Sequence, residues 1–121
     1  MNEKRIADNL IVRLSFEFAL KVIAYVELLE ERKKFVIARQ LLKAGTSIGA
    51  NVREAQNCES RADFIHKFKI AAKEADETQY WLQLCKQSPG YPECEVLIAD
   101  LEPILRIITK IIYSSKSAAD N

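Results

Sequence analysis

The stretch that decides the fold is FIHKFKIAAKEADETQYWLQLC, residues Phe64–Cys85. Apolar or small residues recur in it at alternating steps of four and three, at Phe64, Phe68, Ala71, Ala75, Thr78, Leu82 and Cys85. This spacing places them along one side of an α-helix, in the pattern by which helices pack against each other. The stretch is therefore predicted to be a long helix that packs on other helices.

Both ends of this helix carry boundary signals. Before it, Ser60 can accept a hydrogen bond from a backbone N–H, and Asp63 favours the positive end of the helix dipole. After it, Ser88-Pro89-Gly90 is typical of a turn. The predicted helix covers residues 61–87.

Two similar patterns precede this helix. Apolar residues at steps of three and four predict a helix over residues 10–31, with a second, weaker apolar flank made by Phe16, Leu20 and Ile23. A charged connection at residues 32–34 separates it from a helix predicted over residues 36–57. In that second helix the apolar steps run from Leu41 to Ala55.

A fourth helix is predicted over residues 92–114, with Pro92 in its first turn. Pro103 is expected to kink the helix or divide it between Ala99 and Glu102. Besides its main seam, this helix carries a second stripe at seven-residue spacing, formed by Ile98, Leu105 and Ile112. That stripe indicates either a thoroughly buried helix or an outer surface that packs on another subunit.

Four helices with short connections, and no alternating strand pattern, predict an all-α fold. In a chain of 121 residues they form one domain, residues 1–121. The predicted architecture is an antiparallel up-down four-helix bundle.

Gly45 and Gly49 interrupt an otherwise helix-favouring segment. A phosphate-binding loop is excluded because it needs GxxxxGK[ST] after a strand, and neither is present. A helix boundary is one alternative, since Asn51 and Glu54 imitate a capping box. The apolar seam nevertheless continues through both glycines. We therefore favour a close contact with another helix, which would compensate the cost of about 1 kcal/mol per mid-helix glycine.

The residues that carry chemistry are few. The single histidine, His66, cannot supply the two Glu-x-x-His motifs of a di-iron bundle, so no metal site is predicted. We expect no catalytic residues, no cofactor and no enzymatic activity. The odd number of cysteines, without CxxC spacing, and the lack of a signal peptide or membrane span favour free thiols and a cytoplasmic location.

The net charge of +1 gives no overall attraction for nucleic acid, yet the charges are distributed unevenly. Residues 32–53 contain six basic residues and no acidic residue. The candidates for binding nucleic acid are Arg32, Lys33, Lys34, Arg39, Lys43 and Arg53. The alternative is a solvated surface without a binding role.

Two stretches together carry a family resemblance. QLLKAGTSIGANVREA (residues 40–55) and SRADFIHKFKIAAKEADETQYWLQL (residues 60–84) resemble the bacterial four-helix-bundle proteins encoded in intervening sequences of 23S ribosomal RNA genes. The resemblance extends from about Ser15 to Ser115 and is most specific in the centre, at Gly45–Asn51 and Tyr80–Leu82.

This resemblance implies a ring-like homopentamer without catalytic residues. A related protein, the accessory variability protein of diversity-generating retroelements, implies binding of RNA or DNA, although this chain is less basic. Two hypotheses follow. The chain is a non-enzymatic oligomer that binds nucleic acid through its basic residues, or an oligomeric scaffold whose partner is another protein. The helix-packing and oligomer candidates are Gly45, Gly49, Ile98, Leu105 and Ile112.

Overall fold

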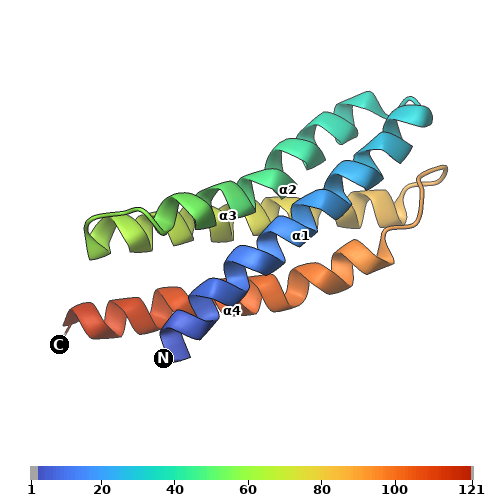
Figure 1. Cartoon of the computed structure of the whole chain (residues 1–121). Helices are drawn as coiled ribbons and strands as arrows, with labels where there is room; N and C mark the ends of the chain where they lie inside the picture. Colours follow the sequence, from blue (N-terminus) through green and yellow to red (C-terminus); the bar gives the residue numbers. More distant parts are fainter. Residues whose placement is uncertain (1–2, 121) are drawn as a thin grey trace.

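The apolar steps of three and four in the sequence correspond to four long helices. The structure, a computed structural model, describes residues 3–120, and the side chains of residues 10–117. Its helices are α1 (Glu3–Glu31), α2 (Phe35–Ala55), α3 (Arg61–Gln87) and α4 (Glu95–Asp120). Successive helices run in opposite directions, and short connections join them at alternating ends (Figure 1). The described chain is thus an all-α, antiparallel up-down four-helix bundle.

The helices contact one another in a closed cycle, α1 with α2, α2 with α3, α3 with α4, and α4 with α1. The predicted seam of α3 faces the centre of this cycle, because Phe68 to Cys85 are buried at the expected steps and Phe64 packs on the core. Apolar side chains of all four helices form one continuous core. Burying them supplies the main stabilising free energy of the bundle.

Local hydrogen bonds define the helix ends. The Ser60 hydroxyl accepts from the backbone N–H of Asp63 at 3.0 Å, so the predicted cap at the start of α3 is present. At the end of α1, Lys33 N–H donates to the Glu30 carbonyl and Lys34 N–H to the Leu29 carbonyl. This is a Schellman motif, in which Lys33 takes the left-handed position with φ of 62°.

The fourth helix differs from its prediction at Pro92, at Pro103 and at its end, which lies at Asp120 and not at residue 114. Pro92 is not in its first turn, because α4 begins only at Glu95, whose N–H donates to the Glu93 carboxylate at 2.6 Å. Pro103 does not divide the helix, which continues without a break to Asp120. Pro103 has no N–H to donate to the Ala99 carbonyl. Because Ala99 is exposed, water can donate a hydrogen bond to that carbonyl instead. The structure also begins α1 at Glu3, before the predicted residue 10.

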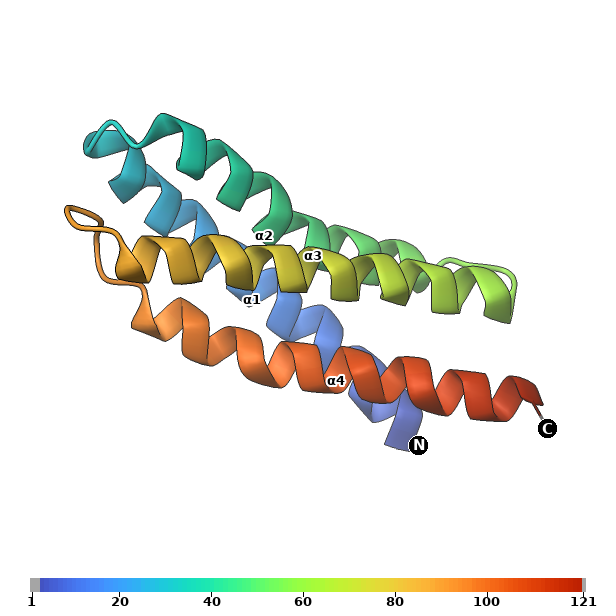
Figure 2. The ribbon, with the colours of Figure 1, turned by 180° about the vertical axis from the view of Figure 1, so that it is seen from behind.

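The first helix is inclined to the fourth. In both views the first half of α1 lies near the second half of α4, whereas the end of α1 turns away from the beginning of α4 toward α2 (Figures 1 and 2). The two helices therefore separate at the end of the bundle that holds the α1–α2 turn.

Candidate interaction surface

Large apolar side chains are unevenly distributed over the outside of the bundle. Of the ten that are exposed among the described residues, seven belong to α1 and α2, namely Phe16, Leu20, Ile23, Leu28, Phe35, Val36 and Leu42. Phe16 and Leu20 are each about half exposed, at 52% and 53%. In an isolated subunit, water would cover these groups at a cost in free energy. A concentration of such side chains on one side of a small protein is typical of an interaction surface.

On α1 these side chains form a stripe opposite the core. Phe16, Leu20 and Ile23 follow one another at steps of four and three, so they share one side of the helix. The sequence identified this group only as a weaker flank. Because Ile11, Phe18 and Val22 occupy the core side of the same helix, the stripe points outward. The helix is therefore apolar on two opposite sides.

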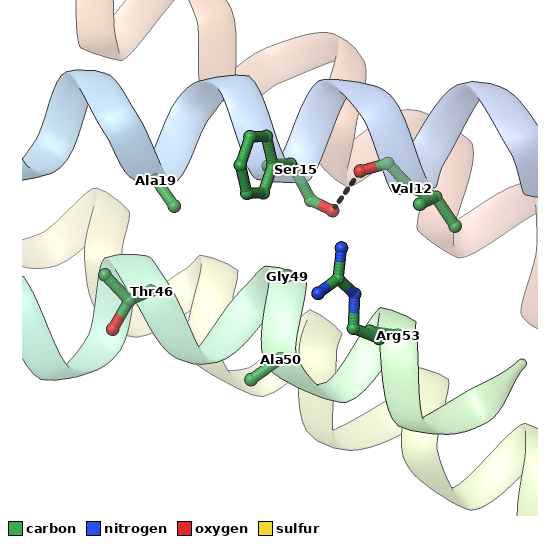
Figure 3. A pocket seen from close by; sticks show the side chains of 8 residues that line it. Val12, Ser15, Ala19, Thr46, Gly49, Ala50 and Arg53 are labelled. Atoms are coloured by element: carbon green, nitrogen blue, oxygen red, sulfur yellow. Dashed lines mark hydrogen bonds between the residues drawn. The ribbon is translucent and has the colours of Figure 1, made fainter. Parts of the chain in front are cut away.

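A shallow groove of about 120 Å³ lies between α1 and α2 beside this stripe. Val12, Phe16 and Ala19 line it from α1, and Thr46, Gly49, Ala50 and Arg53 line it from α2 (Figure 3). The Arg53 guanidinium lies 6.0 Å from the centre of the Phe16 ring, within the range of a cation–π contact. A second groove nearer the α1–α2 turn is lined by Val26, Glu30, Phe35, Ala38, Arg39 and Leu42.

The two glycines of α2 lie in its contact with α1. A Cβ atom at Gly45 would be 2.9 Å from both methyl groups of Val22, and one at Gly49 would be 3.3 Å from the Ser15 carbonyl oxygen. The absence of side chains thus lets the two helix backbones approach. This contact is within the subunit, and α2 passes through both glycines without a break.

A third groove, of about 270 Å³, lies where α1 and α4 separate. Its apolar lining comes from Ala24 and Leu28 on α1 and from Val96 and Leu97 on α4. An ion pair of 2.6 Å joins Lys21, which also lines the groove, to Asp100 of α4. The exposed Leu28 and Val96 leave the apolar floor of the groove accessible to a partner.

Buried hydrogen bonds fix the floor of this third groove. The Tyr25 hydroxyl donates to the Pro92 carbonyl at 2.6 Å, and the Cys94 thiol donates to the Leu82 carbonyl at 3.4 Å. Burial raises the pKa of Tyr25, and it also raises the pKa of the Cys85 and Cys94 thiols. All three groups are therefore neutral near pH 7, and the thiols are weak nucleophiles there. These residues position the start of α4.

The six basic candidates do not form one cluster. Arg32, Lys33 and Lys34 occupy the α1–α2 turn, where Arg32 donates to the Gly90 carbonyl and the Lys34 ammonium lies 5.0 Å from the centre of the Tyr91 ring. Arg39, Lys43 and Arg53 are exposed along α2, and 14 residues of helix between Arg39 and Arg53 span about 21 Å. None of the six belongs to an ion pair among the described side chains.

The stripe of α4 lies elsewhere. Ile98, Leu105 and Ile112 are half-buried and pack against the core, so they are not the most exposed apolar groups of the bundle. Sequence reasoning did not identify Leu28, Phe35, Leu42 and Val96 as site residues. Their apolar character was visible, but their exposure depends on how the helices pack against one another, which the apolar pattern does not specify.

A family model described as 23S rRNA-intervening sequence protein matches residues 7–114. The chain belongs to this family. A crystal structure from Bacteroides thetaiotaomicron VPI-5482, described as a protein with unknown function from the S23 ribosomal protein family, is 43% identical, with a TM-score of 0.83. The similarity covers 88% of this chain and 98% of that chain. No curated protein matches.

Membership of this family agrees with the four-helix architecture and with the two central stretches, residues 40–55 and 60–84, that resemble the family. Neither the family description nor that of the similar crystal structure states a reaction. Among the residues that the structure describes, none of the helices combines the length and the apolar character that a membrane span requires.

Proposed function

We propose that this protein is a non-enzymatic four-helix bundle that assembles with copies of itself and acts as a scaffold for other macromolecules. The observation that supports self-assembly is the apolar stripe Phe16, Leu20 and Ile23 on the outer side of α1, next to grooves on both of its flanks. A stripe of this kind is stabilised when a partner removes it from water.

A ring of identical subunits, pentameric as the family resemblance implies, is the assembly that we propose. The three cysteines are free in the structure, which fits a reducing cytoplasm. The absence of a recognisable set of catalytic residues in the sequence supports a binding role rather than an enzymatic one.

Light scattering coupled to size-exclusion chromatography tests the assembly. At micromolar concentration the wild-type protein is expected to show several times the chain mass of 13.8 kDa. Phe16→Glu with Leu20→Glu should reduce the mass to that of the monomer, because both carboxylates would have to be buried in the contact. Since both positions are exposed, helicity measured by circular dichroism should be retained.

Tyr80→Glu is the matched control. Tyr80 is 59% exposed, as open as Phe16 and Leu20, but it belongs to α3. Its substitution should leave the assembly intact. A wild-type protein that elutes as a monomer over the whole concentration range would contradict the proposal.

A second candidate function is binding to the phosphate backbone of RNA or DNA. The observation in its favour is that the six basic side chains of residues 32–53 have no acidic partner among the described side chains. In a ring, each copy would present Arg32, Lys33 and Lys34 at the same end. Repeated weak contacts would then add to the affinity for one long polyanion.

Salt dependence tests this second function. Affinity for duplex DNA should fall with salt at a log–log slope of about −0.9 for each phosphate neutralised. Replacing Arg32, Lys33 and Lys34 by Gln should flatten the slope while leaving the assembly mass unchanged. If the wild-type protein gives no mobility shift with structured RNA or duplex DNA at low salt, the second function is refuted and the protein-scaffold role stands alone.

A further inference from the structure

The outer surface between α1 and α2 is formed by two matched rows of side chains. The row on α1 follows steps of four and three along the helix, so its members share the side that borders α2. This row consists of Val12, Phe16, Ala19, Ile23, Val26 and Glu30.

A second row with the same steps lies on α2, which runs antiparallel to α1. It consists of Phe35, Arg39, Leu42, Thr46, Gly49 and Arg53. The first groove, of about 120 Å³, is lined by the first half of the α1 row and the last half of the α2 row. The second groove is lined by the opposite ends of the two rows. We call the surface formed by the two rows the α1–α2 crease.

The two grooves of the crease lie where small residues leave space. Ala19, Gly49 and Ala50 line the first groove, and Ala38 lines the second. Gly49 and Ala38 are 11 residues apart on α2, which corresponds to about 16 Å along the helix. Two apolar side chains about three turns apart on one partner helix therefore match the spacing of the grooves, in the manner of knobs that enter holes.

An arginine lines each groove, and neither arginine has an ion-pair partner among the described side chains. The Arg53 guanidinium extends toward α1, 6.0 Å from the centre of the Phe16 ring (Figure 3). Arg39 lines the second groove together with Glu30, but the two do not form an ion pair. Residues 35–53 of α2 contain no acidic residue, so the α2 side of the crease favours a partner with carboxylates.

The groups between the arginines favour a protein partner over nucleic acid. Arg39 and Arg53 are 14 residues, about 21 Å, apart, and the exposed Ile23 and Leu42 belong to the rows between them. A phosphate backbone pairs with cations but has no apolar group to cover these side chains. An amphipathic helix covers apolar groups and pairs with cations in the same contact.

We propose that the α1–α2 crease binds an amphipathic helix of a partner protein, with apolar side chains in the two grooves and carboxylates against Arg39 and Arg53. This inference rests on the proposed scaffold role and names the class of macromolecule that the scaffold holds. Phe16 and Ile23 belong both to the stripe of α1 and to the crease, so the partner helix covers them from the α2 side. Leu20 lines neither groove and stays available for the contact between copies.

A labelled synthetic peptide of about four heptads tests the crease, with leucine at the a and d positions and glutamate at e and g. Its acidic flanks place carboxylates beside α2 in either direction of docking, and their repulsion disfavours pairing of the peptide with itself. Fluorescence anisotropy should show binding to the wild type. The same peptide with lysine at e and g should bind about tenfold more weakly or less, because it meets Arg39 and Arg53 with like charge.

Two variants separate the contributions of charge and shape. Arg39→Glu with Arg53→Glu should invert the preference, so that the lysine peptide binds more tightly than the glutamate peptide. Ala50→Trp fills the first groove without a change in charge and should weaken binding of the glutamate peptide about tenfold. All three positions are exposed, so helicity should be retained.

The matched control is Lys69→Glu with Lys73→Glu, which makes the same change in charge at two exposed positions of α3 and should leave the preference unchanged. If the wild type assembles but does not distinguish the two peptides, or the Arg39 and Arg53 variant keeps the wild-type preference, the crease proposal is wrong while self-assembly stands. A monomeric wild type that prefers the glutamate peptide supports the crease and overturns self-assembly. A wild type that binds duplex DNA through Arg39 and Arg53, and not the glutamate peptide, assigns this surface to nucleic acid and overturns the proposal.

Discussion

Gly45→Ala measures directly how tightly α2 packs on α1. The new Cβ would lie 2.9 Å from both Cγ atoms of Val22, about 0.6 Å inside the shortest favourable carbon–carbon separation. Val22 is fully buried, and its β-branched side chain has few rotamers into which it could retreat. Overpacking of this kind costs about 2 kcal/mol. Replacing a mid-helix glycine by alanine returns about 1 kcal/mol, which leaves a net loss of about 1 kcal/mol.

Thermal unfolding at a fixed protein concentration measures the effect, which corresponds to a fall in Tm of about 4 °C. Ala50→Gly, at an exposed position of the same helix, measures the difference in helix propensity between alanine and glycine. It should lower the free energy of unfolding by about 1 kcal/mol. The double variant with Val22→Ala removes the clash, so its loss should be smaller than the sum of the single losses by about 1–2 kcal/mol. If Gly45→Ala instead raises the Tm by the full propensity gain, the close contact is refuted.

Three further predictions concern single positions and pH. Lys33→Gly should stabilise the fold by up to about 1 kcal/mol in chemical denaturation, because Lys33 has a φ of 62° and glycine takes the left-handed conformation without a steric penalty; an unchanged midpoint would argue against strain there. Ser60→Ala should cost about 1 kcal/mol by removing the cap of α3, whereas Ser60→Asp should retain most of the stability, and equal losses in both would contradict the capping role. Burial raises the pKa of the Cys85 and Cys94 thiols in the folded protein. Their contribution to stability is therefore present below about pH 8.5, the usual pKa of a thiol in an unfolded chain, and is lost as the pH rises further. The free energy of unfolding should therefore decrease above that pH, and replacing both cysteines by alanine should flatten the decrease.

Much of the architecture could be predicted from local patterns. The steps of four and three in residues 64–85 specify a helix with one buried side, and that prediction is confirmed by the burial of Phe68 through Cys85. The Ser60 cap was also predictable, because a cap depends on residues within one turn. The helix bounds were predicted less well, because α1 begins at Glu3 and not at residue 10, and α4 extends from Glu95 to Asp120 and not from residue 92 to 114. The Pro92 carbonyl accepts a hydrogen bond from Tyr25, which lies far away in the sequence, and α4 continues undivided through Pro103.

The interaction surface was harder to predict for a physical reason. Apolar spacing shows which residues share a side of a helix, but the exposure of that side depends on the angle between helices. The half-buried Ile98, Leu105 and Ile112 and the exposed Phe16, Leu20 and Ile23 have similar patterns in the sequence. The packed structure distinguishes them, because the α4 residues pack against the core and the α1 residues lie on the side of their helix opposite the core. The arrangement of the helices depends on contacts between residues distant in the chain, such as the close approach of Gly45 to Val22.

The hydrogen bond from Tyr25 to the Pro92 carbonyl has a consequence for where this chain can accept inserted residues. It attaches the end of the α3–α4 connection to α1 just before α4 begins, while Pro89 and Gly90 remain exposed. Extra residues inserted after Gly90 would extend into solvent without displacing the beginning of α4. Each doubling of the loop length adds only about 0.6 kcal/mol of closure entropy. This connection is therefore a position at which the bundle can accept an added segment, such as a peptide tag, without a change in the packing of its helices.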